Sequence, residues 1–158
     1  MSRPRRLEHF SYVGPALYFL TFCARNRRPT FVESSVFDAT LGKFRNVAIR
    51  ESFAVLAYCF MPDHAHLLVE GLKESSDLRR FAKLMKQHSG AAHALQTGQP
   101  LWQEGYYDRV LREEEDVKEV ARYILDNPVR AGLVRTPSEY PYLGSDVWSL
   151  EELLGSVI

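Results

Sequence analysis

Residues 53–70, FAVLAYCFMPDHAHLLVE, carry the clearest local signal for the fold. The first part of this stretch, residues 53–61, is apolar without interruption, a pattern typical of a central buried strand. Pro62 and Asp63 follow, and both residue types favour a turn. Residues 64–70 then resume as a second strand. The stretch therefore predicts a β-hairpin that turns at Pro62-Asp63.

Working outward from this hairpin, strand and helix signals alternate along the chain. We expect further strands over 17–24 and 106–112, and helices over about 36–50, 77–96 and 113–126, the first capped by Ser35. The first six elements follow the β-α-β-β-α-β order of ferredoxin-like folds. The sequence thus predicts an α+β domain over residues 1–148, with an antiparallel sheet, helices on one face and one more helix near the C-terminus. Residues 149–158 are expected to form a short helical tail.

Composition narrows the class of protein. The chain has 158 residues, of which 46% are hydrophobic and 25% are charged, values that exclude a disordered or fibrous chain. No run of roughly 18 apolar residues occurs, so no transmembrane helix is expected, and no signal-peptide cleavage pattern follows the apolar stretch 16–23. We therefore expect a cytoplasmic protein in which Cys23 and Cys59 are reduced core thiols.

The formal net charge of zero hides a gradient along the chain. Residues 1–50 hold nine basic and three acidic side chains, residues 51–100 hold five of each, and residues 101–158 hold six basic and twelve acidic ones. A neutral protein with this distribution can still present a basic surface on one side. The neutral total does not exclude a nucleic-acid partner.

Two histidines in the second hairpin strand form the first candidate site. Side chains alternate between the faces of a strand, so His64 and His66 project from the same face, about 6–7 Å apart at their bases. They can converge on one divalent metal ion, for which imidazole is a suitable ligand. Two partly exposed histidines beside a turn are the plainer interpretation. Asp63 fits best as a turn residue, with a direct ligand role as the minor alternative.

A tyrosine on the last long helix forms the second candidate site. The apolar positions of the helix over 113–126 make one stripe, and Tyr123 lies roughly 130° away from the centre of that stripe. Asn127, four residues later, lies on the same side as Tyr123. The plainer interpretation is a boundary tyrosine with Asn127 as the helix C-cap. Asp116 and Glu119 lie nearby, with a metal role as a minor alternative.

The two candidate sites together suggest a reaction. A phenol can act as a covalent nucleophile, and a metal ion held by two histidines and an amide oxygen can polarise a phosphate. Tyr123 would then attack the phosphorus while His64, His66 and Asn127 hold the ion. The products are a phosphotyrosine ester and a free 3′-hydroxyl, and the ester conserves the bond energy needed for rejoining.

Three segments of the chain resemble the single-tyrosine HUH transposases, and in particular the REP-associated tyrosine transposases. They are YFLTFCARNRRPTF (18–31), VLAYCFMPDHAHLLVEG (55–71) and LWQEGYYDRVLREEEDVKEVARYILDNPVRAGLV (101–134), and the resemblance extends over roughly residues 8–145. It implies cleavage of single-stranded DNA beside palindromic hairpins with Mg²⁺ or Mn²⁺. It also implies catalytic roles for His64, His66 and Tyr123, with Asn127 as the third polar ligand. One departure is Leu125-Asp126, where the family often has aromatic or histidine residues.

Basic and aromatic residues supply candidate DNA contacts. Arginines can bind phosphates without reading sequence, and exposed rings can stack on unpaired bases. The basic candidates are Arg3, Arg5, Arg6, Arg25, Arg27, Arg28, Arg79, Arg80, Lys83 and Lys86; the aromatic ones are Trp102, Tyr106 and Tyr107. A solvated charged face and a core tryptophan are the corresponding plainer interpretations. His88 and His93 are expected on a helix surface.

The leading hypothesis is a metal-dependent single-stranded DNA endonuclease and strand transferase that acts at hairpin DNA through a 5′-phosphotyrosine intermediate. The alternative is a domesticated, non-catalytic protein that binds hairpin DNA. An unrelated metallohydrolase is a third reading, which lacks a general base at a recognisable spacing. The sequence leaves open whether the protein is a monomer or a homodimer.

Overall fold

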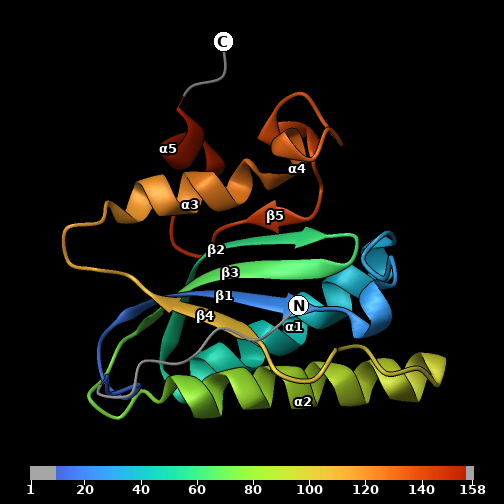
Figure 1. Cartoon of the computed structure of the whole chain (residues 1–158), viewed down its shortest axis with the longest axis horizontal. Coiled ribbons are helices and arrows are strands. Elements are labelled where there is room, and N and C mark those ends of the chain that lie inside the picture. Colours follow the sequence, from blue (N-terminus) through green and yellow to red (C-terminus); the bar gives the residue numbers. More distant parts are fainter. Residues whose placement is uncertain (1–9, 156–158) are drawn as a thin grey trace.

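The computed structural model describes residues 10–155 (Figure 1). Three of the predicted phosphate-binding residues, Arg3, Arg5 and Arg6, lie outside this range. Five strands form one antiparallel sheet in the order β4-β1-β3-β2-β5. Their bounds are β1 Leu17–Cys23, β2 Phe53–Met61, β3 His64–Gly71, β4 Tyr107–Val110 and β5 Leu143–Gly144. The predicted hairpin is confirmed: β2 and β3 pair antiparallel, with Met61 opposite His64 across the turn at Pro62-Asp63.

Helices cover both faces of the sheet. The two long helices, α1 (Ser34–Glu51) and α2 (Leu78–Thr97), lie together on one face, and α3 (Val117–Leu125) lies on the other (Figure 1). Two short helices, α4 (Asn127–Arg130) and α5 (Leu150–Leu154), accompany α3 on its side. The predicted α+β class and antiparallel sheet are confirmed. None of the helices in the described part of the chain is long and apolar enough to cross a membrane.

The alternation of β3 divides the interior into two cores. Ala65, Leu67 and Val69 belong to the core under α1 and α2, whereas Leu68 belongs to the core under α3. The first core is rich in aromatic rings, with Phe22, Phe31, Phe44, Phe60 and Trp102 in edge-to-face, tilted and stacked contacts at centroid distances of 5.0–6.0 Å. Offset and edge-to-face ring pairs add stability beyond simple burial. This aromatic core fixes the position of the hairpin on which the histidines lie.

The second core holds the tyrosine helix on the sheet. Its members include Leu56, Cys59 and Leu68 from the strands and Ala121, Ile124 and Leu125 from α3. A bulge between Val55 and Ala57 shifts the register of β2 against β3. Cys59 and Cys23 are both buried and free, as the sequence predicts.

Several predicted boundaries need correction. The helix expected from residue 113 begins at Val117, because the Asp116 side chain accepts hydrogen bonds from the backbone N–H groups of Lys118 and Glu119 and so caps the helix there. The first helix begins at Ser34, with Glu33 rather than Ser35 at its N-cap. The strand expected over 106–112 is limited to Tyr107–Val110.

The end of β3 makes a close backbone contact that only glycine permits. A Cβ at Gly71 would lie 2.5 Å from the backbone oxygen of Gly14, so we expect Gly71→Ala to lower the free energy of unfolding by about 1–3 kcal/mol. Gly42→Ala is the matched control: it lies in α1 with no atom within 4 Å of its added Cβ, and should raise stability by about 0.8–1 kcal/mol. Urea unfolding curves measure both, and equal midpoints would contradict this account.

Candidate functional site

The two histidines lie on one face of the sheet, as the alternation of β3 predicts, and α3 packs on that same face. The register places His64 opposite Cys23 and His66 opposite Thr21 of β1. The two imidazole rings meet edge to face, with centroids 4.7 Å apart and an interplanar angle of 78°. Both rings therefore reach one small region of space beside the sheet.

Each ring is held by a partner on its Nδ1 atom. Nδ1 of His64 lies 2.7 Å from Oδ1 of Asp63, and Nδ1 of His66 lies 2.9 Å from Oγ1 of Thr21. The other oxygen of Asp63, Oδ2, accepts from Nε of Arg27 at 2.9 Å. Partners of this kind fix the tautomer and orientation of histidines that bind metals. Among the described residues, the Nε2 atoms remain as the nitrogens available to a ligand.

The charge states suit a cation. Burial, together with the charges of His64, Arg130 and Arg27, lowers the pKa of His66 to about 3, so its imidazole is neutral at pH 7 and has a lone pair to donate. Burial tends to raise the pKa of Asp63, but hydrogen bonds from His64 and Arg27 hold that pKa below its usual value. The site thus contains the neutral imidazole of His66 and, beside it, the imidazole of His64, which the carboxylate of Asp63 orients.

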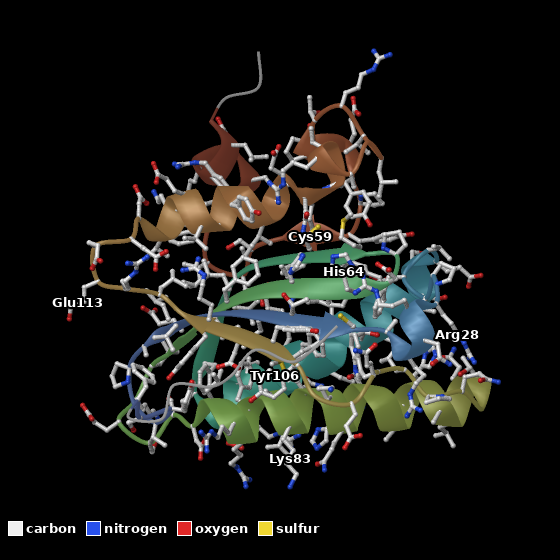
Figure 2. All side chains as sticks on the ribbon, in the orientation of Figure 1. Arg28, Cys59, His64, Lys83, Tyr106 and Glu113 are labelled. Carbon is white, nitrogen blue, oxygen red and sulfur yellow. The ribbon has the colours of Figure 1, made fainter. Side chains whose placement is uncertain are left out.

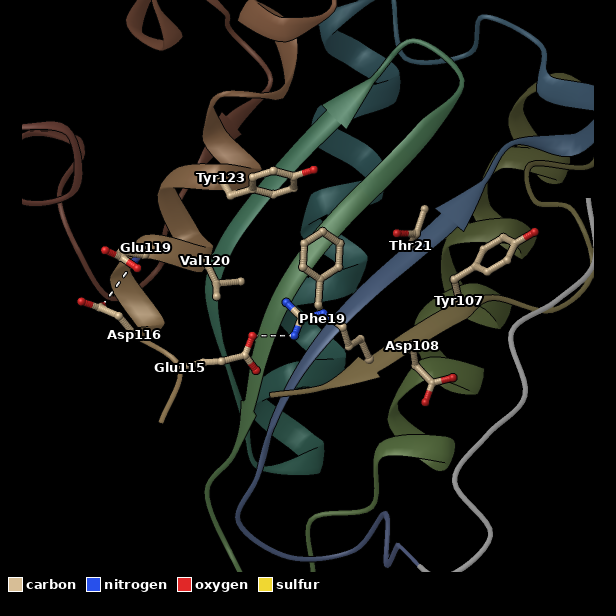
Figure 3. A pocket seen from close by; sticks show the side chains of 10 residues that line it. Phe19, Thr21, Tyr107, Asp108, Glu115, Asp116, Glu119, Val120 and Tyr123 are labelled. Atoms are coloured by element: carbon tan, nitrogen blue, oxygen red, sulfur yellow. Dashed lines mark hydrogen bonds and ion pairs between the residues drawn. The ribbon is translucent and has the colours of Figure 1, made fainter. Parts of the chain in front are cut away.

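The tyrosine of α3 faces the same side of the sheet. Tyr123 is 57% exposed, and its ring lines a cavity of about 780 Å³ with Phe19, Val120 and acidic residues of the α3 N-terminus (Figure 3). A smaller cavity of about 280 Å³ is lined by both histidines, Cys23 and Arg27. Thr21 and Tyr107 line both cavities. The tyrosine and the histidine pair therefore open onto adjoining hollows.

The residues that follow α3 place the positively charged side chain of Arg130 against the ring of Tyr123. Asp126 is the C-cap of α3, so the interpretation of Asn127 as that cap is wrong; Asn127 begins α4. Its Oδ1 accepts a hydrogen bond from Nη2 of Arg130 at 3.2 Å. The guanidinium carbon of Arg130 lies 3.9 Å from the centroid of the Tyr123 ring.

The structure brings the two imidazoles together, whereas Asn127 lines neither the histidine cavity nor the tyrosine cavity. In the part of the chain that the structure describes, no three His, Cys, Asp or Glu side chains are grouped to hold a metal. Asp116 and Glu119, near the start of α3, are the alternative candidates for a metal ligand. Asp116 caps α3, and Glu119 lines the tyrosine cavity, so neither lies with the histidines.

Sequence comparison assigns the chain to a family. Residues 13–127, a range that contains both histidines and the tyrosine, match the model of a family described as transposase IS200 like. The chain belongs to the IS200-like transposase family. The expected resemblance is thereby confirmed at the level of the family.

Named relatives share most of the length of this IS200-like chain. The chain is 26% identical over 138 residues to the REP-associated tyrosine transposase of Escherichia coli K12, covering 83% of this chain and 77% of the relative. It is 24% identical over 155 residues to a provisionally named REP-associated tyrosine transposase of Haemophilus influenzae, with 90% and 84% covered. A solved REP-associated tyrosine transposase bound to a REP hairpin has the same fold, with a TM-score of 0.75 at 24% identity over 90% of this chain and 82% of that one.

One of the three arginines that follow β1 reaches the histidine site. Arg27 joins Asp63 and lines the histidine cavity, Arg25 donates to the backbone oxygen of Trp102, and Arg28 donates to Gln99. Arg27 adopts a left-handed backbone conformation, with φ of 54°. Arg27 is therefore the loop arginine that the structure brings into the site.

The basic stripe of α2 lies on the opposite face of the sheet from the histidines, and Figure 2 shows Lys83 and His64 on opposite sides. Arg79 packs over the Tyr12 ring and Arg80 pairs with Glu51. Lys86 donates to the backbone oxygens of Gln103 and Gly105, and burial lowers its pKa to about 8. This stripe is not part of the proposed catalytic site.

Two of the three aromatic candidates pack against the core. Trp102 is only 7% exposed, and its indole N–H donates to Ser89 at 2.9 Å. Tyr106 is half-buried with its ring centroid 5.7 Å from that of Phe22. Trp102 is thus a core residue, and its ring is not exposed for stacking on a base.

Two residues of the site were missed by sequence reasoning. Thr21 has no local signal, because its role depends on the register that sets β1 against β3. Arg130 lies seven residues after Tyr123, which is about two helical turns, and three residues after Asn127, which is about one turn. That spacing is the signal that could have identified it.

Proposed function

We propose that the chain is a metal-dependent single-stranded DNA endonuclease and strand transferase that acts beside hairpin DNA. The observation that carries this proposal is the adjoining pair of hollows, one lined by two anchored histidines and the other by an exposed tyrosine, in a chain of the IS200-like transposase family. Tyr123 is the nucleophile, His64 and His66 are metal ligands, and Asn127 is the third ligand.

The two imidazoles suit a first-row divalent cation such as Mn²⁺, and they suit Mg²⁺ less well. Two imidazoles whose Nδ1 atoms are already engaged can present their Nε2 atoms, and the Asn127 amide adds a hard oxygen donor of the kind these ions accept. A bound ion supplies Lewis-acid polarisation of the scissile phosphate and stabilises the charge that develops on it.

Tyr123 carries the covalent step. Its phenolic oxygen attacks the phosphorus, a bond forms between them, and the bond from phosphorus to the 3′-oxygen breaks. The departing 3′-oxygen takes up a proton, and the phenol loses one to solvent. A 5′-phosphotyrosine ester and a free 3′-hydroxyl result, and attack by another 3′-hydroxyl reverses the step and joins strands.

Hairpin DNA is the proposed substrate. A REP hairpin is the ligand of the solved relative with the same fold, and the transposases of E. coli and H. influenzae carry REP-associated names. Arg27 supplies a phosphate contact at the histidine cavity, and Arg25 and Arg28 supply further contacts from the same loop; such contacts would position the strand without reading its sequence.

A covalent adduct tests the function directly. A labelled oligonucleotide that carries a palindromic hairpin and a single-stranded flank is incubated with the protein and Mn²⁺, then separated under denaturing conditions. We expect a labelled protein band and a shortened strand with a free 3′-hydroxyl, and neither in EDTA. If the protein binds hairpin oligonucleotides but cleaves none of those taken from repeated sequences of its host genome, that result would favour the non-catalytic alternative.

The contact between Thr21 and His66 gives a test of the metal site. Thr21→Val keeps the shape of the side chain but removes the hydroxyl that holds Nδ1 of His66, so we expect Mn²⁺ affinity to fall by about 10- to 100-fold. Thr21→Ser retains the hydroxyl and should stay close to wild type. Isothermal titration measures both affinities, and equal values for the two variants would contradict the assignment.

A further inference from the structure

Arg130 touches three residues around the proposed reaction centre. Its guanidinium carbon lies 3.9 Å from the centroid of the Tyr123 ring. Its Nη2 donates to Oδ1 of Asn127 at 3.2 Å, and its Nη1 lies 3.4 Å from Oδ2 of Asp126. The side chain is 35% exposed, so the guanidinium remains accessible to a ligand while it rests on the ring.

The position of Arg130 follows from the break between α3 and α4. Asp126 ends α3, and Asn127-Pro128 starts a four-residue helix that finishes at Arg130. Pro128 is buried and fits the first turn, where its missing N–H is not needed. This short helix turns the long Arg130 side chain back across Tyr123. The charge of Arg130 adds to the effect of burial in lowering the pKa of His66, and it opposes the rise in pKa that burial causes at Cys59, so its field reaches the histidine hollow.

The contact with Asn127 conflicts with metal binding. The oxygen that Arg130 engages is the one proposed to complete the metal shell. A guanidinium and a divalent cation on one oxygen repel each other. Binding of the ion at Asn127 must therefore displace Arg130, whose stacking on Tyr123 leaves its N–H groups beside the nucleophile.

We propose that Arg130 is a ligand of the scissile phosphate, held on Asn127 in the absence of DNA and released to the phosphate when the metal ion takes the Asn127 oxygen. This inference rests on the proposed function. A guanidinium is suited to the new role because its planar fork binds two phosphate oxygens at once. Stacked on the Tyr123 ring, it brings the phosphate toward the phenolic oxygen.

Two readouts that move in opposite directions test the proposal. In Arg130→Ala, Mn²⁺ affinity without DNA, measured by electron paramagnetic resonance, should rise about threefold or more because a competing cation is removed. Single-turnover cleavage of the hairpin oligonucleotide should fall by about 10²-fold, the usual loss for one contact to the transition state. A merely structural role would not tighten metal binding while slowing cleavage.

Two further variants separate charge from geometry. Arg130→Lys keeps the positive charge, so it should cleave faster than Arg130→Ala and slower than wild type, without tighter Mn²⁺ binding. Arg135→Ala removes one exposed positive charge from the next loop and should leave both readouts unchanged. Equal thermal midpoints for all variants exclude a loss of folding.

Either of two results overturns the proposal. One is an Arg130→Ala protein with Mn²⁺ affinity no higher than wild type, and the other is one with wild-type cleavage. If the wild-type protein forms no adduct on any hairpin substrate, the proposed function fails. The Mn²⁺ comparison then decides the Arg130 contact by itself, and an unchanged affinity overturns it.

Discussion

Tyr123→Phe should form no covalent adduct with hairpin DNA. It should cleave that DNA more slowly than the wild-type protein by a factor of about 10⁴ or more. The substitution removes only the phenolic oxygen, the atom proposed to attack the phosphorus, and loss of a covalent nucleophile costs a factor of this size or more. The measurement is single-turnover cleavage of a labelled hairpin oligonucleotide in Mn²⁺, with the adduct separated under denaturing conditions.

The loss in Tyr123→Phe must come from chemistry and not from folding or binding. The Tyr123 ring is 57% exposed and its hydroxyl makes no hydrogen bond among the described residues, so the thermal midpoint and the hairpin Kd in EDTA should stay at wild-type values. Tyr107, which lines both hollows, is the competing phenol. An adduct that persists in Tyr123→Phe and disappears in Tyr107→Phe would move the nucleophile to β4.

His66→Ala should abolish Mn²⁺ binding at the site and slow cleavage by about 10³-fold, a loss equivalent to about 4 kcal/mol of transition-state stabilisation. The imidazole of His66 is anchored through Thr21, and the two donors that remain without it cannot retain the ion tightly. His64→Ala should have a similar effect, because the two rings share one site. Isothermal titration with Mn²⁺ and single-turnover cleavage measure the two losses.

His88→Ala is the matched control for the histidine variants. His88 lies on α2, on the opposite face of the sheet, where its Nδ1 contacts Arg50. It should bind Mn²⁺ and cleave DNA as the wild-type protein does. Wild-type Mn²⁺ stoichiometry in His66→Ala would exclude the histidine pair as the metal centre, whatever the effect on cleavage.

The fold could be predicted from sequence to the extent that local patterns determine it. An apolar run, a Pro-Asp turn and an alternating strand were enough to define the β2–β3 hairpin. Helix ends were less accessible, because capping competes with helix propensity: the acidic run from Glu113 was expected to be helical, but the side chain of Asp116 caps the helix at Val117. The side of the sheet on which α3 packs depends on tertiary contacts that no local pattern carries.

The same distinction applies to the candidate site. Strand alternation correctly placed His64 and His66 on one face, and helical periodicity correctly turned Tyr123 away from its own core stripe. Contacts between distant segments were out of reach. The Thr21 partner of His66 required the β1–β3 register, and Trp102 could not be distinguished from an exposed base-stacking ring without its buried bond to Ser89.

The alternation of β3 also governs how this protein can diversify. Neighbouring residues on one strand serve separate tasks: Ala65 and Leu67 pack in the aromatic core, while His64 and His66 face the tyrosine helix. Substitutions among the aromatic residues should change how many molecules are folded, but not the turnover of each folded molecule. Substitutions around the two cavities should change the turnover of each folded molecule but not the number of folded molecules. The proposed DNA specificity and chemistry can therefore be altered by substitution while the scaffold stays intact.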